Sequence, residues 1–564
     1  MSTRNAGYND GCQPLVCALL TGGMVLFSSL AFAAIDPDVA ARQINRPYFK
    51  EAETRLRPRS SEVPAPFEKP VDEEVPQGAL FDLKKIVLRG VHSLPESVFA
   101  SLIAKYEGRK VSLGELAQLA REIQSLYLEK GLIAACIIPP QEIQNGEASL
   151  LCVETRMGDL HIKDHKYFRK QILERYWKTN KGEILRYSKI QKSLELMNKN
   201  PDRRVRTDLR AGKEPGTTDV LLDVQSRRPY HVSLSTDNEG AVQTGRQRTT
   251  YGFRHNNFLG FDDALLFGYS LTHNTDGKYV YHRLALNDLG TSLMYGYSYS
   301  KSHPQKTYTS LEMYSFSRSA SVMLFQELYC DKGRSGEASL GFDAKDTSTN
   351  LFSGTITRDR LRVARLGGNF TFSGVKQETS FSPSIAQGLN GMGASSRNEY
   401  SSRDATNTFT KFSLGVSQKL MLPWRLTLAS RLSGQASSRR LPSAEAYSLG
   451  GIDSVRGYSE GDRIADNVLQ GNFDLLFPLP FIPQLRAVRH SLTGVVFFDW
   501  AYGEQRIDKE AEGRTCILES LGAGIRYQVD DNAFLRVEWG FPLGDDPLTG
   551  NKTSRLHFSF GLEF

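Results

Sequence analysis

The C-terminal part of the chain alternates apolar and polar residues with a period of two. From about residue 230 to the end, short segments of this kind are separated by clusters of Gly, Asn, Asp and Ser. Alternation predicts half-buried β-strands, because successive side chains of a strand point to opposite sides. Four segments show the apolar faces: Leu293, Tyr295, Tyr297 and Tyr299; Phe412, Leu414 and Val416; Leu535, Val537, Trp539 and Phe541; and Phe558, Phe560, Leu562 and Phe564. At about 20 residues for each strand and turn, residues 228–564 predict about 16 antiparallel strands.

An export signal precedes this region. Arg4 stands before an apolar stretch over residues 15–32, and Ala31-Phe32-Ala33 matches the small-x-small site of signal peptidase. We expect a signal peptide over residues 1–33, with an uncleaved membrane anchor as the alternative. After this stretch, no apolar run approaches the ~20 residues that a membrane-spanning helix needs.

Strands behind an export signal fit two architectures, a soluble all-β domain and an outer-membrane β-barrel. Both alternate apolar and polar residues. The aromatic-rich apolar faces and the C-terminal Phe564 favour the barrel, in which the apolar face meets lipid and the polar face lines the lumen. A barrel of about 16 strands has room for such a lumen.

Two small α+β modules are predicted between the signal and the barrel. Residues 34–57 favour a helix with too few apolar positions for a core of its own, and residues 58–79 form a Pro-rich linker. Residues 80–156 and 157–227 each follow the order strand, helix, helix, strand, strand. In the first module we expect strands at 81–88, 132–139 and 148–154 and helices at 95–106 and 112–130. Ser112, with Glu115 three places on, is the N-cap candidate of the second helix. In the second module we expect helices at 166–179 and 188–198 and strands at 204–210 and 218–224.

Four cysteines remain once the signal is removed. Cys136 and Cys152 flank a short loop between two predicted strands, a spacing that a cross-strand disulfide can bridge in an oxidising compartment. Two buried free thiols are the alternative. The sequence contains no CxxC pair, so we expect no structural metal.

Charge and motif searches exclude several classes of function. The net charge of +7 is small for 564 residues and includes no dense basic block, so we expect no nucleic-acid partner. No Walker-type or HExxH motif occurs. Gly457-Tyr458-Ser459-Glu460-Gly461 matches GxSxG by letter, but it lies among predicted strands with no helix after it, so it is no nucleophile elbow. His161 and His165 are spaced i, i+4, but without the intervening Glu we interpret them as exposed. We therefore predict neither an enzyme nor a cofactor.

The most informative stretch is a glycine-rich loop from Gly450 to Gly461. It contains the tetrapeptide Val455-Arg456-Gly457-Tyr458 and is long enough to fold back on itself. Taken alone, an Arg-Gly-Tyr turn fits a solvated loop tip equally well.

The ordered set of features resembles a known family. The set comprises the signal, the helix and linker, two modules, the barrel, the tetrapeptide at Val455-Arg456-Gly457-Tyr458, and then Phe497-Phe498-Asp499-Trp500-Ala501. The first module adds Pro139 followed by Gln141-Glu142-Ile143. Over essentially the whole mature chain this resembles the two-partner-secretion transporters (TpsB) of the haemolysin and filamentous-haemagglutinin type, within the BamA-like superfamily.

The resemblance implies a role for each part. The two modules would be POTRA domains in the periplasm that bind an unfolded partner chain, and the helix at 34–57 would plug the lumen. The loop at about 442–470 would fold into the barrel, where Arg456 pairs with Asp499. Period two places Phe497 and Asp499 on one face of their strand, so we expect Asp499 to point into the lumen. Ala501 departs from the family motif, which favours Gly there.

The chemistry of this pair sets the free energy that its loss would cost. A guanidinium can hold a carboxylate with two hydrogen bonds, which a lysine cannot do. In a dry site, loss of the Asp499 carboxylate would leave Arg456 uncompensated, at a cost of about 3–5 kcal/mol.

The function implied by the resemblance is export across the bacterial outer membrane. The protein would pass a secreted partner exoprotein of haemolysin, adhesin or contact-dependent toxin type through its lumen without ATP, and some family members also activate what they export. A monomeric barrel in lipid is the default expectation. The alternatives are a BamA-like assembly factor, which usually carries more POTRA copies and no plug helix, and a passive porin.

Overall fold

The computed structural model describes residues 80–564 except 142, 144, 304–312, 332, 353, 396–400, 480–489, 508–512, 531 and 549–552. The predicted signal peptide (1–33), plug helix (34–57) and linker (58–79) lie outside the described residues, as does Glu142. The described chain forms two compact units. One consists of Tyr230–Phe258 and Asp263–Phe564, and the other of residues 80–229 with Leu259–Asp262.

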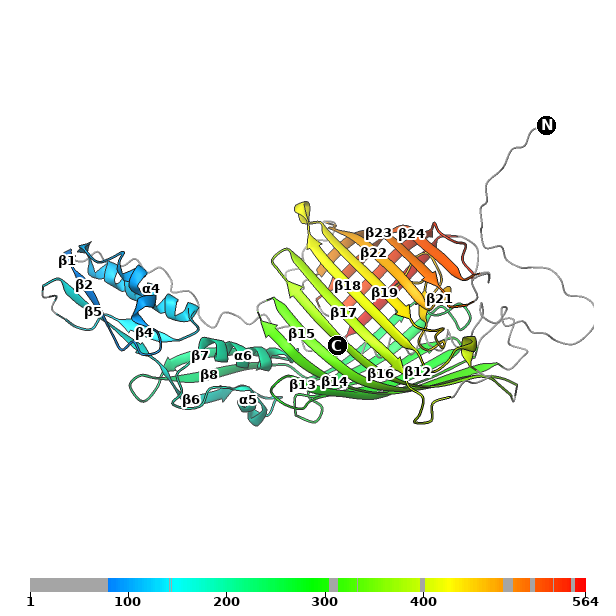
Figure 1. Ribbon diagram of the computed structural model, residues 1–564, viewed down its shortest axis with the longest axis horizontal. Helices are drawn as coiled ribbons and strands as arrows, with labels where there is room; N and C mark the ends of the chain where they lie inside the picture. The colour runs from blue at the N-terminus through cyan, green and yellow to red at the C-terminus, as the bar shows by residue number, and fades with distance from the viewer. Residues whose placement is uncertain are drawn as a thin grey trace, which may run out of the picture. The chain divides into compact units, whose positions relative to one another are not determined.

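The first of these units is a closed β-barrel of 16 antiparallel strands (Figure 1). Each strand pairs with its neighbour in the sheet, and β26 closes the barrel on β9. The predicted fold class is therefore confirmed. The strands are β9 (Tyr230–Asp237), β10 (Arg248–His255), β11 (Ala264–Thr272), β12 (Thr275–Ala285), β13 (Thr291–Ser302), β14 (Tyr314–Asp331), β15 (Arg334–Leu351), β16 (Gly354–Ser373), β17 (Gln377–Gly388), β18 (Thr410–Met421), β19 (Thr427–Ser437), β22 (Asn467–Pro478), β23 (His490–Glu504), β24 (Thr515–Val529), β25 (Ala533–Pro542) and β26 (Arg555–Glu563).

The two faces of the strands differ as the alternation predicts. On β23, Val496 and Phe498 are 44% and 39% exposed, whereas Phe497 is 1% and Asp499 0% exposed. Apolar side chains thus cover the outer face, and polar side chains point inward. Asp499 lies on the inner face.

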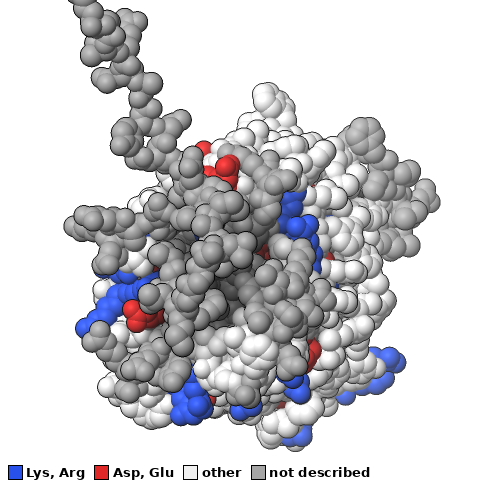
Figure 2. All heavy atoms as spheres, turned by 90° about the vertical axis from the view of Figure 1, so that its right-hand side faces the viewer, with Lys and Arg blue, Asp and Glu red and all other residues white. Residues whose placement is uncertain are grey.

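The connection between β19 and β22 is the long loop predicted from the glycines. It spans residues 438–466 and contains a small hairpin of β20 (Tyr447–Leu449) and β21 (Arg463–Ala465). On the described atoms of the end face in Figure 2, Lys and Arg side chains lie in several separate groups among uncharged residues and some Asp and Glu side chains, in line with the small net charge.

The first α+β module is more divided than the sequence predicts. The strand expected at 81–88 is two strands, because the backbone N–H groups of Lys84 and Lys85 both donate to the Gly146 carbonyl at the break. One half pairs with an unpredicted short strand between the helices, and the other joins a three-stranded sheet in the order β2-β5-β4. The elements are β1 (Phe81–Leu83), β2 (Lys85–Arg89), η1 (Glu96–Val98), α3 (Ala100–Ile103), β3 (Arg109–Val111), α4 (Leu113–Glu129), β4 (Ala134–Ile137) and β5 (Glu147–Glu154).

Local contacts hold this module together. The capping box predicted for α4 is present: the Glu115 N–H donates to Ser112 Oγ at 3.2 Å, and the Ser112 N–H donates to Glu115 at 2.8 Å. The Glu154 carboxylate accepts hydrogen bonds from Ser93 and from the Tyr127 hydroxyl. Burial alone would raise the pKa of Glu154, but these hydrogen bonds lower it below its usual value.

The second module follows the predicted order of elements. It comprises β6 (Arg156–Lys163), α5 (Lys170–Tyr176), α6 (Tyr187–Asn198), β7 (Arg203–Ala211) and β8 (Thr217–Ser226), with sheet order β6-β8-β7. No helix in the described part of the chain is long and apolar enough to cross a bilayer.

Candidate functional site

The tip of the long loop, residues 450–461, is buried against the inner wall of the barrel. Four glycines with positive φ, at 450, 451, 457 and 461, allow its sharp turns. A Cβ at Gly457 would lie 3.1 Å from backbone atoms of Gly540 and Pro542, so this close approach also requires glycine. Val455 and Tyr458 are fully buried in an apolar cluster with wall residues that include Ala501. Alanine at the position where the family favours glycine is thus part of the packing.

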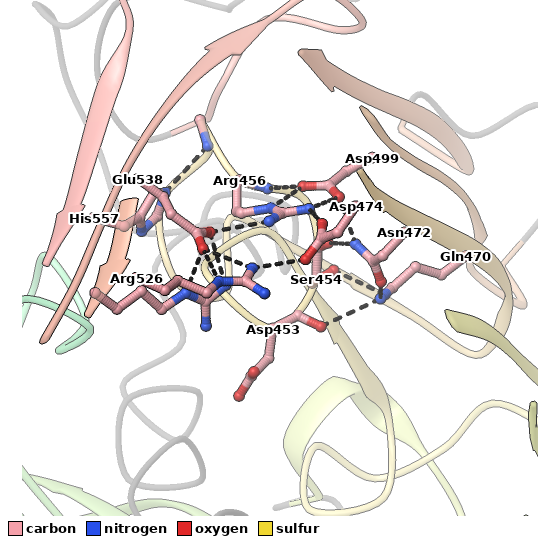
Figure 3. Close-up of polar contacts among 12 residues, drawn as sticks. Asp453, Ser454, Arg456, Gln470, Asn472, Asp474, Asp499, Arg526, Glu538 and His557 are labelled. Carbon is pink, nitrogen blue, oxygen red and sulfur yellow. Dashed lines mark hydrogen bonds and ion pairs between the residues drawn. The ribbon is translucent and has the colours of Figure 1, made fainter. Parts of the chain in front are cut away.

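Arg456 forms a two-pronged ion pair with Asp499 (Figure 3). Its Nε donates to Asp499 Oδ2 at 2.7 Å and its Nη2 to Oδ1 at 2.5 Å, and the Arg456 backbone N–H also donates to Oδ2 at 3.0 Å. The guanidinium lies 3.5 Å from the ring centroid of Phe497. The structure thus brings together Arg456, Phe497 and Asp499. The planar guanidinium holds the Asp499 carboxylate with two hydrogen bonds and lies over the ring of Phe497.

Two more carboxylates reach the same guanidinium, so the expectation that loss of Asp499 would leave Arg456 uncompensated is wrong. Nη2 donates to Asp474 at 2.6 Å, and Nη1 donates to Glu538 at 2.9 Å. Arg526 bridges these two carboxylates, with 2.6 Å to Asp474 and 2.7 Å to Glu538, and Arg536 also pairs with Glu538.

The cluster is balanced in charge and distributed around the wall. Three arginines meet three carboxylates, and the wall residues come from four consecutive strands, β22 to β25. Sequence reasoning missed Asp474, Arg526, Arg536 and Glu538, although each is a charged residue on the polar face of an alternating strand. That pattern alone predicts that their side chains point into the lumen.

Neutral side chains of the wall bind the loop backbone. Asn472 donates to Asp499 at 2.8 Å and to the Ser454 carbonyl at 2.5 Å. His557 Nε2 accepts the Gly457 N–H at 3.2 Å. These contacts fix the backbone on both sides of Arg456 and orient its side chain towards the carboxylates.

The other predicted site residues lie in the first module. Cys136 and Cys152 face each other across β4 and β5 and form a disulfide. The side-chain amide of Gln141 accepts from the Ser149 N–H at 2.7 Å and donates to the Ser149 carbonyl at 2.8 Å, which mimics a paired strand beside β5 beyond the end of β4. Pro139 and Ile143 are half-buried in the same β4–β5 connection.

One group in the second module has the residue types of a metal site. Donor atoms of Asp159, His161 and Asp219 lie within 4.8 Å of one another. The Lys181 ammonium, however, is 2.5 Å from an Asp159 oxygen. This hydrogen bond lowers the pKa of Asp159. The ammonium thus already neutralises that carboxylate. His161 is exposed as predicted, whereas His165 is half-buried, so the prediction is wrong for that residue.

Comparison with known families matches both units. Residues 216–527 match the family of haemolysin secretion/activation proteins ShlB/FhaC/HecB, and residues 81–155 match the ShlB-type POTRA domain. The chain belongs to this family. It is therefore a two-partner-secretion transporter of the bacterial outer membrane, with its POTRA domains in the periplasm.

Individual relatives agree with this assignment. The chain is 23% identical over 464 residues to the heme/hemopexin transporter protein HuxB of Haemophilus influenzae (strain 86-028NP), covering 79% of this chain and 80% of the relative. It is 26% identical over 398 residues to the outer membrane transporter CdiB of Dickeya dadantii (strain 3937), covering 68% and 70%. The solved structure of CdiB from Escherichia coli shares the fold, with a TM-score of 0.68 at 18% identity over 96% of this chain and 100% of that one.

Proposed function

We propose that this transporter recognises an unfolded partner exoprotein through its periplasmic modules and passes it through the barrel lumen without ATP. The observation that carries the proposal is the loop tip, which is held inside a closed barrel by hydrogen bonds, ion pairs and apolar packing, with no covalent link to the wall in the described contacts. The loop tip can therefore leave its site and return without the breaking of a covalent bond. The proposal also includes a signal peptide (1–33), a plug helix (34–57), a linker (58–79) and a POTRA identity for the second module (157–227).

Free sheet edges in the modules support recognition of an extended chain. In the second module β7 is at the edge of the sheet, and no described strand pairs with its outer side. The Asn198 side chain caps this edge at Val205: Nδ2 donates to the carbonyl at 3.1 Å, and Oδ1 accepts the N–H at 2.6 Å. Strand addition beyond that point would supply main-chain hydrogen bonds with little demand on the partner's sequence.

The balanced charge of the loop site supports reversible release of the loop tip. When Arg456 leaves, Asp474 and Glu538 keep Arg526, and Glu538 also keeps Arg536. The wall therefore loses one cation without leaving every carboxylate unpaired. A partner segment that displaces the tip would bind the open state better than the closed state and shift the equilibrium towards it.

Folding of the partner outside the cell would supply the direction of transport. A chain that has folded on the far side cannot diffuse back through the barrel without unfolding again. The relatives' names include heme/hemopexin and haemolysin transporters, which supports a secreted exoprotein as the partner class. Activation of that exoprotein during export is part of the family's description, and we include it in the proposal. We propose a single barrel in outer-membrane lipid as the working unit.

Secretion of a co-expressed partner exoprotein into the medium tests this function. Cells with the transporter should secrete the partner, and its lytic or binding activity should be compared with that of partner purified from a strain without the transporter. Retention of the partner in the periplasm despite normal barrel levels would contradict the proposal. Depletion of other outer-membrane barrels when this protein is removed would instead favour an assembly factor.

A further inference from the structure

A second buried charge cluster holds the limb of the loop that leads to the tip. Glu445 lies before β20, and its side chain is 1% exposed. Its carboxylate accepts from Lys345 Nζ at 2.9 Å, Arg365 Nη2 at 2.6 Å and Lys411 Nζ at 2.7 Å. These three cations project from β15, β16 and β18, so they form a second site on the wall.

The polarity of this cluster is the reverse of that at the tip. At the tip a loop cation meets wall carboxylates, whereas here a loop carboxylate meets wall cations. Asp343 also accepts from Arg365 at 2.5 Å, so three cations share two carboxylates, one of them from the loop. Without Glu445 the wall would carry excess positive charge, which favours return of the carboxylate.

The two clusters occupy different arcs of the barrel. The cations around Glu445 come from β15 to β18, and the partners of Arg456 come from β22 to β25. In the order of the sheet, β19 lies between these two arcs. The loop is therefore fixed to two separate parts of the wall.

Further contacts fix the backbone around Glu445. The Lys411 ammonium also donates to the Glu445 carbonyl at 2.9 Å. Leu441 and Ala446 are buried in an apolar cluster on the wall, and the Leu441 N–H donates to Asp466 at 2.9 Å. We call residues 441–446 the root of the loop.

We propose that Glu445 anchors the root to the β15–β18 arc independently of Arg456, so that the tip swings about a fixed root when it leaves its site. Glu445 is thus a positioning residue for the loop. The anchor is a property of the barrel itself, whereas its use during export rests on the proposed function. Loss of Arg456 alone should free the tip but leave the root in place.

Two cysteine reporters can separate root from tip. Cys516 lies on the inner face of β24 against the apolar cluster that contains Val455 and Tyr458, so it reports on the tip. Ala446→Cys reports on the root. The first reporter needs a Cys330→Ser background, and the second needs Cys330→Ser with Cys516→Ser. The readout is the rate of modification by a membrane-impermeant maleimide in intact outer membranes.

Each single variant should raise labelling only at the reporter in its own part of the loop. Arg456→Ala should raise the labelling rate at the tip reporter and leave the root reporter protected. Glu445→Gln should raise labelling at the root reporter and leave the tip reporter protected, and the double variant should expose both. Glu337→Gln is the matched control, because this carboxylate pairs with Arg283 on the wall and should change neither rate.

Two results would overturn the anchor. One is equal exposure of both reporters in Arg456→Ala, which would mean that the root follows the tip. The other is a root reporter that stays protected in Glu445→Gln, which would mean that apolar packing holds it without the charge. If Glu445→Gln does not yield a folded barrel, Lys345→Met with Lys411→Met removes two of the three cations that hold Glu445 and leaves Arg365, so labelling of the root reporter should rise while the tip reporter stays protected. Because labelling does not depend on secretion, a failure of the anchor can be told apart from a failure of the proposed function.

Discussion

Removal of the Arg456 side chain should free the loop tip far more than removal of the Asp499 charge. In Asp499→Asn, Arg456 keeps Asp474 and Glu538 as ion-pair partners. In Arg456→Met, Asp499 is left fully buried with Asn472 as its remaining side-chain partner among the described contacts. The asymmetry follows because the wall has spare carboxylates for the arginine, but Asp499 has no second arginine.

The contacts set the expected sizes. An orphaned buried charge costs about 3–5 kcal/mol, which applies to Arg456→Met because Asp499 is 0% and the Arg456 side chain 3% exposed. Loss of charge-assisted hydrogen bonds alone costs about 1.5–3 kcal/mol, which applies to Asp499→Asn. At about 1.4 kcal/mol for each factor of ten, tip opening should rise about 140- to 4,000-fold in the first variant and about 10- to 140-fold in the second.

The labelling rate of Cys516 measures this opening. When the tip opens and closes faster than the thiol reacts, the rate is proportional to the open fraction. Arg456→Lys should give an intermediate rate, because an ammonium cannot hold both Asp499 oxygens in a planar fork. Equal rates in Arg456→Met and Asp499→Asn would refute the reasoning, since they would show that Asp474 and Glu538 do not support the arginine.

Three further predictions concern the module and the wall. Replacing Cys136 and Cys152 by Ser should cost the first module about 3 kcal/mol, because the disulfide closes a loop with a sequence separation of 16, and hydrogen exchange of α4 in the full chain would measure it. Burial raises the pKa of Glu154, but its hydrogen bonds lower it below the unfolded value, so its stabilisation is present above the unfolded pKa and lost as the pH falls through the folded one. In Glu154→Gln, the hydrogen-exchange protection of the first module should therefore fall less as the pH is lowered. A pH profile identical to that of the unchanged protein would contradict this role of Glu154. Gly540→Ala should expose the tip reporter, because the new Cβ would lie 2.6 Å from the loop backbone, whereas unchanged labelling would show that the tip docks elsewhere.

The architecture could be predicted from local patterns. Period-two alternation gave the barrel and the inward direction of Asp499, and the capping box of Ser112 and Glu115 gave the start of α4. These signals are local, since they depend on residues a few positions apart. The break at Lys84 could not be predicted, because it depends on the Gly146 carbonyl, far along the chain.

The site could be predicted only in part. The pairing of Arg456 with Asp499 followed from a family resemblance, and neither residue signals its partner by spacing. Glu538 lies 82 positions from Arg456, and Glu445 lies 80 positions from Arg365. Such contacts are fixed by closure of the barrel and by the register of each strand pair, which sequence alternation does not specify.

Photo-crosslinking to a stalled partner tests the central claim most directly. A partner exoprotein fused to a tightly folded domain should stall in transit, and a photoreactive residue would replace either Ser413 or Leu414, neighbours on β18. Ser413 shares the inner face with Lys411, whereas Leu414 is 38% exposed on the outer face. Export through the lumen predicts a crosslink to the stalled partner from Ser413 and none from Leu414. A crosslink from Leu414 alone, or from neither position while secretion is demonstrably jammed, would contradict passage through this barrel.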